Sequence, residues 1–322
     1  MTCDPVPPTP RLTLGISACL LGEPVRYNGG HKRDRYILEK LSPHFDFRPI
    51  CPEMAIGLGT PRPPLRLVQE GAALRVLGAR DPTLDVTSAL SAMGQRIAST
   101  AHDLSGYIFK ARSPSCGVER VKIYDPDGKA SRMGRGVYAD ALLEALPLLP
   151  AEEEGRLKDA ALRENFIERV VAYRDWQDLL AAGATAEALV QFHTRHKLQL
   201  MAHGSAHLRI LGRLIAQLAE APLAQTVDHY GTGFMHTLHY RATRKRHANV
   251  LYHAMGYLKK QLGAPDKAEL THAIEAYRVG HVPRIVPITL MRHHLHQHPH
   301  PYLIQQVYWD WAPPALGLWN ET

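Results

Sequence analysis

The chain has 322 residues, of which 45% are hydrophobic and 21% charged, and its 38 Lys and Arg outnumber 31 Asp and Glu to give a formal net charge of +7. This length predicts two domains, and the composition excludes a wholly disordered chain. No apolar run approaches the roughly 20 residues that span a bilayer, and the start lacks a signal peptide's apolar core, so we expect a cytoplasmic protein with no membrane partner. The positive charge suits a polyanionic partner but does not require one.

Up to residue 150, short β-rich runs alternate with helical stretches. The strand candidates are LTLGIS (12–17), FDFRPI (45–50), a hairpin in LRLVQEGAALRVLG that turns at Glu70-Gly71, GYIFK (106–110) and VKIYD (121–125). Helical stretches are expected at 36–41, 81–104 and 137–146. This alternation predicts a Rossmann-like α/β domain with a mainly parallel sheet over residues 1–150.

A boundary is expected at PLLPAEEEG, where prolines meet an acidic run. Beyond it, strand signals nearly vanish, and residues 151–322 predict an all-α helical domain with a proline-bearing tail. Its apolar residues recur at helical intervals over 152–182, 186–203, 205–218 and 236–262.

Three of the four cysteines follow predicted strands. Cys19, Cys51 and Cys116 each lie just past a strand with Gly or Pro within three residues, whereas Cys3, in the proline-rich start, follows no strand. Strand ends of an open parallel sheet share one edge, where such folds bind ligands, so we expect these three thiols to converge. The alternative for each one is a small buried hydrophobic residue.

Three converging thiolates favour an iron–sulfur cluster over zinc. Structural zinc sites use paired short spacings such as CxxC, and no such pair is present. A cubane cluster is usually held by four thiolates, so three would leave one iron open to a substrate atom.

Polar residues accompany these cysteines. Glu53 lies two residues after Cys51, and Ser113 and Ser115 precede Cys116. A carboxylate and a hydroxyl beside an open metal site suit a general base and a proton donor. The structural alternatives are a carboxylate at a helix start for Glu53 and turn or capping roles for the serines.

Three segments carry a resemblance to a known family. ISACLLGEPVRYNGGHKRD, CPEMAIGLGTPRPP and FKARSPSCG resemble the signature blocks of the bacterial thiouracil desulfidase family, in the same order. In the second half, EGRLKDAALRENFIERV, HKLQLMAH, HANVLYHAMGYLKK and RIVPITLMRHH resemble the helical domain often fused to it. The whole arrangement is similar to the bacterial RNA thiouridine desulfidases, which remove sulfur from 4-thiouridine in tRNA.

The resemblance implies a 4Fe-4S cluster held by Cys19, Cys51 and Cys116, with Glu53 as catalytic residue. It also implies a catalytic serine, which we place at Ser113 with Ser115 as the alternative. The reaction implied is hydrolysis of 4-thiouridine in tRNA to uridine and hydrosulfide, without redox change. The alternatives are desulfurisation of free 2-thiouracil or 4-thiouracil and a non-enzymatic iron–sulfur protein that binds RNA or senses redox state.

A tRNA substrate requires groups that bind phosphate, and no protein partner is implied. Basic residues with interleaved tyrosines in RATRKRHANVLYHAMGYLKK suit phosphate contact and base stacking, and the alternative is a solvated helix face. The RNA-contact candidates are Arg244, Lys245 and Arg246 on this segment, Lys32 and Arg33 in the first domain, and Lys110, Arg112 and Ser115 near the SPSC loop. Most of the 19 histidines lie after residue 150, where we expect surface or packing roles rather than a metal site.

Overall fold

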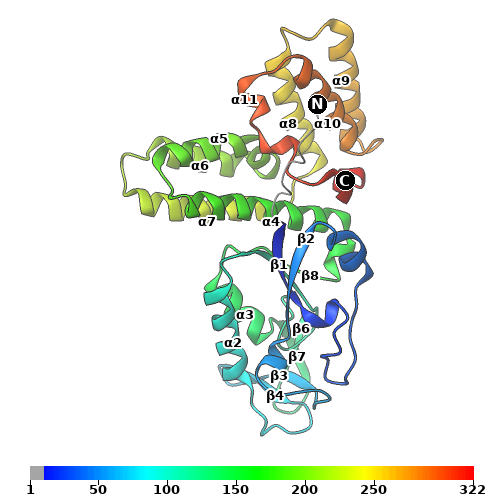
Figure 1. Cartoon of the computed structure of the whole chain (residues 1–322), viewed down its shortest axis with the longest axis vertical. Helices are drawn as coiled ribbons and strands as arrows, with labels where there is room; N and C mark the ends of the chain where they lie inside the picture. Colours follow the sequence, from blue (N-terminus) through cyan, green and yellow to red (C-terminus); the bar gives the residue numbers. More distant parts are fainter. Residues whose placement is uncertain (1–10) are drawn as a thin grey trace, which may run out of the picture. The chain divides into compact units, whose positions relative to one another are not determined.

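The computed structural model describes residues 11–322, so Cys3 lies outside the described part (Figure 1). The chain divides into two compact units, Met1–Arg156 and Leu157–Thr322, which we call the first unit and the helical unit. The first unit extends past residue 150 because strand β8 (Ala151–Glu153) pairs with β5 (Leu104–Phe109). An α/β unit is thus followed by a helical one, as the sequence predicts.

The first unit contains a four-stranded parallel sheet in the order β2-β1-β5-β8. Strands β1 (Leu12–Ser17) and β2 (Phe45–Ile50) have the expected bounds, and every residue of β5 is buried. Such uninterrupted burial is typical of a strand in the middle of a parallel sheet. The short elements that follow these strands are η1 (Ala18–Leu20), η2 (Ile37–Leu41) and α1 (Pro52–Ala55).

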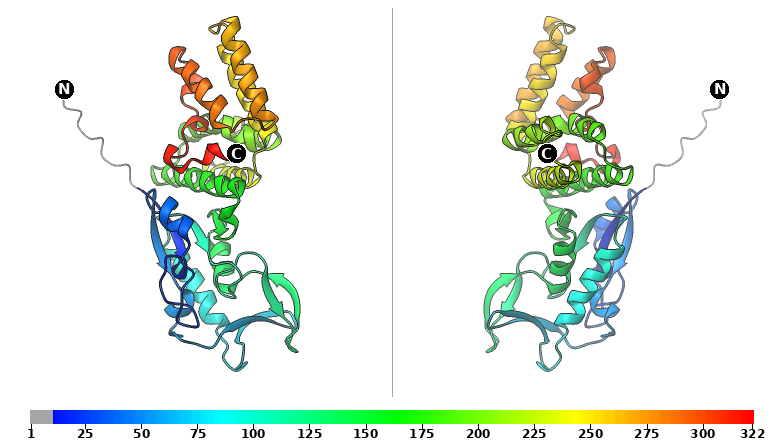
Figure 2. Two further views of the ribbon diagram at one scale, coloured as in Figure 1. Left: turned by 90° about the vertical axis from the view of Figure 1, so that its right-hand side faces the viewer. Right: turned by 90° about the vertical axis from the view of Figure 1, so that its left-hand side faces the viewer.

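A second, mixed sheet has the order β4-β3-β6-β7 (Figures 1 and 2). Strands β3 (Leu65–Glu70) and β4 (Ala73–Gly78) form the expected hairpin, with Gly71 at φ 58° in its turn. Strand β6 (Val121–Tyr124) pairs parallel with β3 and antiparallel with β7 (Ala130–Gly134), a strand the sequence reading missed.

Helices α2 (Thr87–Thr100) and α3 (Val137–Ala145) pack closely against each other. Gly94 permits this approach, because a Cβ there would lie 2.7 Å from the carbonyl oxygen of Tyr138. The same packing fixes the start of α3, which contacts the loop that carries Cys116.

The helical unit places α8–α11 on one side of a layer formed by α4–α7 (Figures 1 and 2). Its helices are α4 (Ala160–Ala181), α5 (Ala186–His203), α6 (Ser205–Ala216), α7 (Leu223–His239), α8 (Arg244–Leu258), α9 (Ala264–Arg278), α10 (Ile285–Gln297) and α11 (Pro301–Ile304). The single helix expected over 236–262 is wrong. The chain leaves α7 after His239, and the Thr243 side chain caps α8 by accepting a hydrogen bond from the Arg246 amide.

Charged groups lie buried between the helices of this unit. Arg284, the N-cap residue of α10, pairs with Glu164 of α4, and His203 of α5 lies 3.0 Å from Glu168. The attraction between the last two raises the pKa of His203 and lowers that of Glu168 against the opposing effect of burial. Within residues 11–322, no helix combines the length and apolar character needed to cross a bilayer.

Candidate active site

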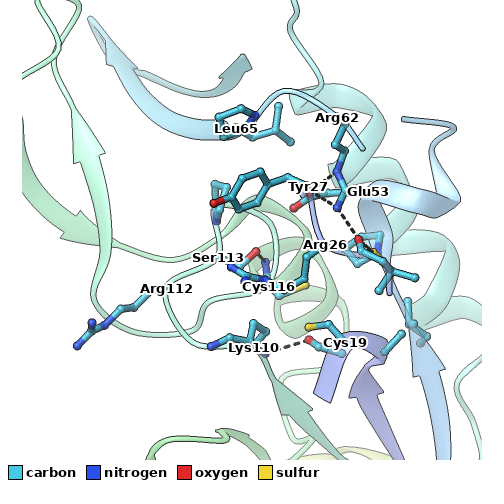
Figure 3. Close-up of a pocket in the computed structure, with 18 of the residues that line it drawn as sticks. Cys19, Arg26, Tyr27, Glu53, Arg62, Leu65, Lys110, Arg112, Ser113 and Cys116 are labelled. Carbon is cyan, nitrogen blue, oxygen red and sulfur yellow. Dashed lines mark hydrogen bonds and ion pairs between the residues drawn. The ribbon is translucent and has the colours of Figure 1, made fainter. Parts of the chain in front are cut away.

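Three cysteines line one pocket of about 390 Å³ in the first unit (Figure 3). Cys19 follows β1, Cys51 follows β2 and begins α1, and Cys116 lies in the loop after β5. Cys19 and Cys116 are buried, Cys51 is half-buried, and all three are free thiols. The parallel order of β2, β1 and β5 brings these distant positions to the same sheet edge.

Hydrogen bonds fix the loop that carries Cys116, two of them between near neighbours in sequence. The Ser113 hydroxyl accepts from the backbone amides of Ser115 and Cys116 at 3.3 and 3.1 Å, which closes a tight turn. The carbonyl of Ser115 accepts from the Ala139 amide of α3. Across the sheet edge, the Ser17 hydroxyl accepts from the Lys110 amide at 2.9 Å.

Burial is the main cause that raises the pKa of all three thiols. It raises the pKa of Cys19 to about 11, and the pKa values of Cys51 and Cys116 are also raised. The mutual repulsion of their thiolate charges adds to this for Cys19 and Cys116. These thiols are therefore protonated near neutral pH, and a cationic group that binds them must displace the protons.

Glu53 faces the same pocket and is held through both carboxylate oxygens. Arg62 donates to Oε2 from Nε at 2.8 Å and lies 2.7 Å from it through Nη2. The Ser115 hydroxyl donates to Oε1 at 2.7 Å. Oε1 accepts this single hydrogen bond and retains a lone pair, so the carboxylate keeps capacity to accept from a further ligand.

Arg62 is a site residue that sequence reasoning missed. Its guanidinium also donates to the carbonyls of Gly59 at 2.7 Å and Val25 at 2.9 Å, and its side chain is only 4% exposed. The residue stands between prolines in TPRPP, and this pattern predicts a turn rather than a buried ion pair. Only the fold shows that Arg62 pairs with Glu53.

Residues 14–154 match the 2-thiouracil desulfurase family. The first unit carries a thiouracil desulfurase domain. Residues 197–313 match a family described as a protein of unknown function, DUF1722. The chain thus joins a thiouracil desulfurase domain to a DUF1722 region, which lies in the helical unit.

Two individual proteins are similar to parts of the chain. The uncharacterized protein YbgA of Escherichia coli (strain K12) is 28% identical over 151 residues, which cover 47% of this chain and 89% of YbgA. The solved structure of the 4Fe-4S-dependent thiouracil desulfidase TudS is 32% identical, covers 46% of this chain and 94% of its own, and superposes with a TM-score of 0.38.

Several residues expected from the sequence lie at the pocket of the desulfurase domain. Ser113, Lys110 and Arg112 line it, whereas Ser115 lies behind it, fully buried against Glu53. The Lys110 ammonium pairs with Glu154. Arg112 is exposed and points away from the cysteines (Figure 3).

Other expected residues lie elsewhere. Lys32 and Arg33 are exposed and do not line the pocket. In the helical unit, Arg244 lies over the ring of Tyr277, Lys245 is exposed, and Arg246 donates to the carbonyl of His203 at 2.8 Å. The Arg246 side chain therefore has a structural role at the end of α5, and whether these three contact RNA stays a prediction.

No group of three or more His, Cys, Asp or Glu side chains within residues 11–322 is arranged to hold a single metal ion. This applies to the histidine-rich tail, where His294 is buried and His293 and His296 are exposed. It applies equally to Cys19, Cys51 and Cys116, which line one pocket.

Proposed function

We propose that this chain is a 4Fe-4S-dependent thiouracil desulfidase. The reaction replaces the thiocarbonyl sulfur of a thiopyrimidine with the oxygen of water and releases hydrosulfide, with no change of oxidation state. The observation that carries the proposal is a single pocket that joins three free cysteines to a buried, positioned carboxylate. The family match of residues 14–154 supports it, and TudS, 32% identical, is named for the same activity.

The three cysteines suit a cubane cluster. They line one pocket, and such a cluster takes each thiolate on a different iron. Cys19, Cys51 and Cys116 would hold it. When bound, such a cluster supplies an iron without a protein ligand, a soft Lewis acid suited to a thiocarbonyl sulfur.

Glu53 is suited to act as a general base that orients a water molecule and accepts its proton. Its carboxylate lines the pocket and is fixed by Arg62 and Ser115, so its free lone pairs have a defined direction. A water molecule that donates to Glu53 is oriented toward the pocket and becomes more nucleophilic as its proton moves to the carboxylate. Ser115 holds the opposite oxygen and stabilises this orientation.

A non-enzymatic sensor has no need for this arrangement. A sensor requires ligands for the cluster, but it does not require a carboxylate fixed by a buried arginine and a buried hydroxyl. Holding these polar groups away from water costs free energy that a binding role does not recover. The positioned Glu53 therefore favours catalysis.

Thiolated tRNA remains a second candidate substrate. The comparisons name thiouracil, and none of them names tRNA, so the free base is the primary proposal. The observation in favour of RNA is the exposure of Arg241, Arg244 and Lys245 around the start of α8. These side chains suit phosphate contacts.

The test is anaerobic reconstitution with iron and sulfide, followed by incubation with 2-thiouracil, 4-thiouracil and 4-thiouridine-containing tRNA. The loaded chain should consume a thiouracil and release one hydrosulfide per uracil formed, and the apo chain should not. Cys116→Ala should abolish both cluster absorbance and turnover, whereas Cys3→Ala serves as the matched cysteine removal. Full activity in Cys116→Ala, or a loaded chain inert toward every thiolated substrate, contradicts the proposal.

A further inference from the structure

A hollow of about 920 Å³ lies between helices α9 and α10 of the helical unit (Figure 1). Its lining residues recur every three or four positions along each helix, so one face of α9 and one face of α10 form its walls. Among its apolar side chains, Ile285 and Leu290 are half-buried and Val286 is 40% exposed. Apolar surface therefore faces solvent in this hollow, which we call the α9–α10 groove.

The α9–α10 groove is acidic, although the chain as a whole carries a formal charge of +7. The described residues that line it include two carboxylates, Asp266 and Glu269, and neither lysine nor arginine. Glu269 is exposed, and within residues 11–322 neither carboxylate forms an ion pair. The groove therefore suits a guest that presents positive charge beside apolar side chains.

A buried histidine in the wall of the groove lacks hydrogen-bond partners. His294 of α10 lines the groove and is only 4% exposed, and both of its ring nitrogens are buried without a partner in the part of the chain that the structure describes. Buried polar atoms are nearly always hydrogen-bonded, so this exception indicates a contact that the single chain does not supply. An arginine that enters the groove can donate to the unprotonated ring nitrogen.

Helix α6 of the same unit exposes a surface of complementary chemistry. Its sequence, SAHLRILGRLIA, is rich in Leu and Ile, yet Leu211 is its only buried residue. Ile210 is 48% exposed and lies with Arg209 and Arg213 in a surface hollow of about 460 Å³ that residues of α6 line. Both arginines are exposed, and neither has an ion pair among the described residues. This surface, which we call the α6 face, thus combines an exposed apolar side chain with positive charge.

We infer that the α9–α10 groove binds the α6 face of a second copy of this chain. Arg209 and Arg213 lie one turn apart on α6. Asp266 and Glu269 lie one turn apart on α9, so the two pairs of opposite charges match in spacing. Ile210, beside the arginines, then meets the apolar walls of the groove. A two-fold arrangement uses both surfaces of both copies and closes after two copies, which doubles the contact.

Sedimentation velocity of the reconstituted full-length chain tests this inference. The chain should associate as its concentration rises to about 100 µM, and salt should weaken the association. Glu269→Lys should raise the dissociation constant about tenfold, because it places like charges opposite each other, and so should Arg209→Glu or Arg213→Glu. Combining Glu269→Lys with one of the two arginine reversals should return the dissociation constant to within about threefold of the parent value, because an ion pair of opposite polarity forms.

The three substituted positions are exposed, so the variants should unfold at the same temperature as the parent chain. Glu144→Lys, at an exposed position of the first unit, is the matched charge reversal and should leave association unchanged. A chain that stays monomeric at every concentration overturns the inference and assigns the groove to a different occupant. Association that the single reversals do not weaken, or that neither combined variant restores, overturns it too, because the copies then meet through other surfaces.

Discussion

At the scale of single residues, the candidate site depends on how Glu53 is held. Its two oxygens receive different partners, Arg62 on Oε2 and Ser115 on Oε1, and both partners are buried. A catalytic carboxylate displaced by about 1 Å can lose about 100-fold in rate, so the supporting groups matter as much as the carboxylate. Arg62 acts here as a positioning residue, because it affects the proposed reaction by orienting the Glu53 carboxylate.

Arg62→Met should therefore lower kcat by about 100-fold while leaving KM and cluster absorbance nearly unchanged. The methionine fills part of the volume but cannot orient the carboxylate. Arg62→Lys should restore part of kcat, because it returns one donor. Steady-state kinetics on reconstituted chains check this, with Arg75→Gln as the matched loss of an exposed, ion-paired arginine. A parallel loss of cluster absorbance and kcat would indicate a merely structural role.

The two serines of the SPSC loop should have separable effects. Ser115→Ala removes the hydroxyl that donates to Glu53 and should lower kcat about tenfold without changing stability greatly. Ser113→Ala removes the acceptor of two backbone amides and should lower the free energy of unfolding by about 1 kcal/mol. Kinetics and thermal unfolding of both variants decide the roles. An inactive but fully stable Ser113→Ala beside an active Ser115→Ala would identify Ser113 as the catalytic serine.

At the scale of elements, the strands that position the site could be predicted from sequence. Apolar runs bounded by Gly and Pro gave β1, β2 and the β3–β4 hairpin their bounds, because buried strands leave this local signature. Strand β7, with few apolar residues, leaves no such signature, since its partner β6 determines its pairing. The break between α7 and α8 was missed for a related reason: apolar residues continue at helical spacing across it, and only the cap at Thr243 marks it.

Close backbone contact between the Cys116 loop and α3 should make Gly136 sensitive to substitution. A Cβ at this position would lie 2.5 Å from the Ser115 carbonyl and 2.9 Å from the Cys116 amide. Gly136→Ala should displace the loop, lower the free energy of unfolding by about 1–3 kcal/mol and reduce the iron bound per chain. Gly155→Ala meets nothing within 4 Å and is the matched control. Unchanged iron content and unfolding temperature in Gly136→Ala would show that the loop position is not determined by α3.

Helix α5 should make the stability of the helical unit depend on pH. His193 is buried and its Nδ1 lies 3.0 Å from the Tyr230 hydroxyl. Burial, assisted by Lys197, lowers its pKa to about 4. The folded chain therefore keeps His193 neutral while the unfolded chain protonates it below about pH 6.5, so its contribution is complete above that pH and is lost as pH falls toward 4.

This loss should reach about 3 kcal/mol for His193 over that interval. His193→Gln removes the titrating group and should flatten the fall in urea midpoint between about pH 7 and about pH 5. His281→Gln, at an exposed position, is the matched control. A variant whose midpoint falls as steeply as that of the parent chain would show that His193 does not carry this dependence.

At the scale of the whole molecule, the candidate active site lies in the first unit, whereas packed helices make up the helical unit. All the residues of the cysteine pocket lie before residue 157. The sequence alone predicted RNA contacts in both halves, because clustered basic residues are visible as charge patterns. The pairing of Glu53 with the buried Arg62 leaves no charge pattern, because only the fold brings the two side chains together.

This division predicts that the first unit works without the helical unit. Residues 1–156 have their own core, so the fragment should fold, bind the cluster and turn over thiouracil within about threefold of the intact chain. Reconstitution of fragment and full chain side by side, with iron content and kcat/KM for thiouracil, is the measurement. The same pair assayed on thiolated tRNA tests which unit binds RNA. If the first unit suffices, the fragment retains salt-dependent tRNA turnover, whereas a loss confined to tRNA assigns RNA binding to the helical unit. A folded, cluster-loaded fragment inactive on thiouracil would instead show that the helical unit contributes to the chemistry itself.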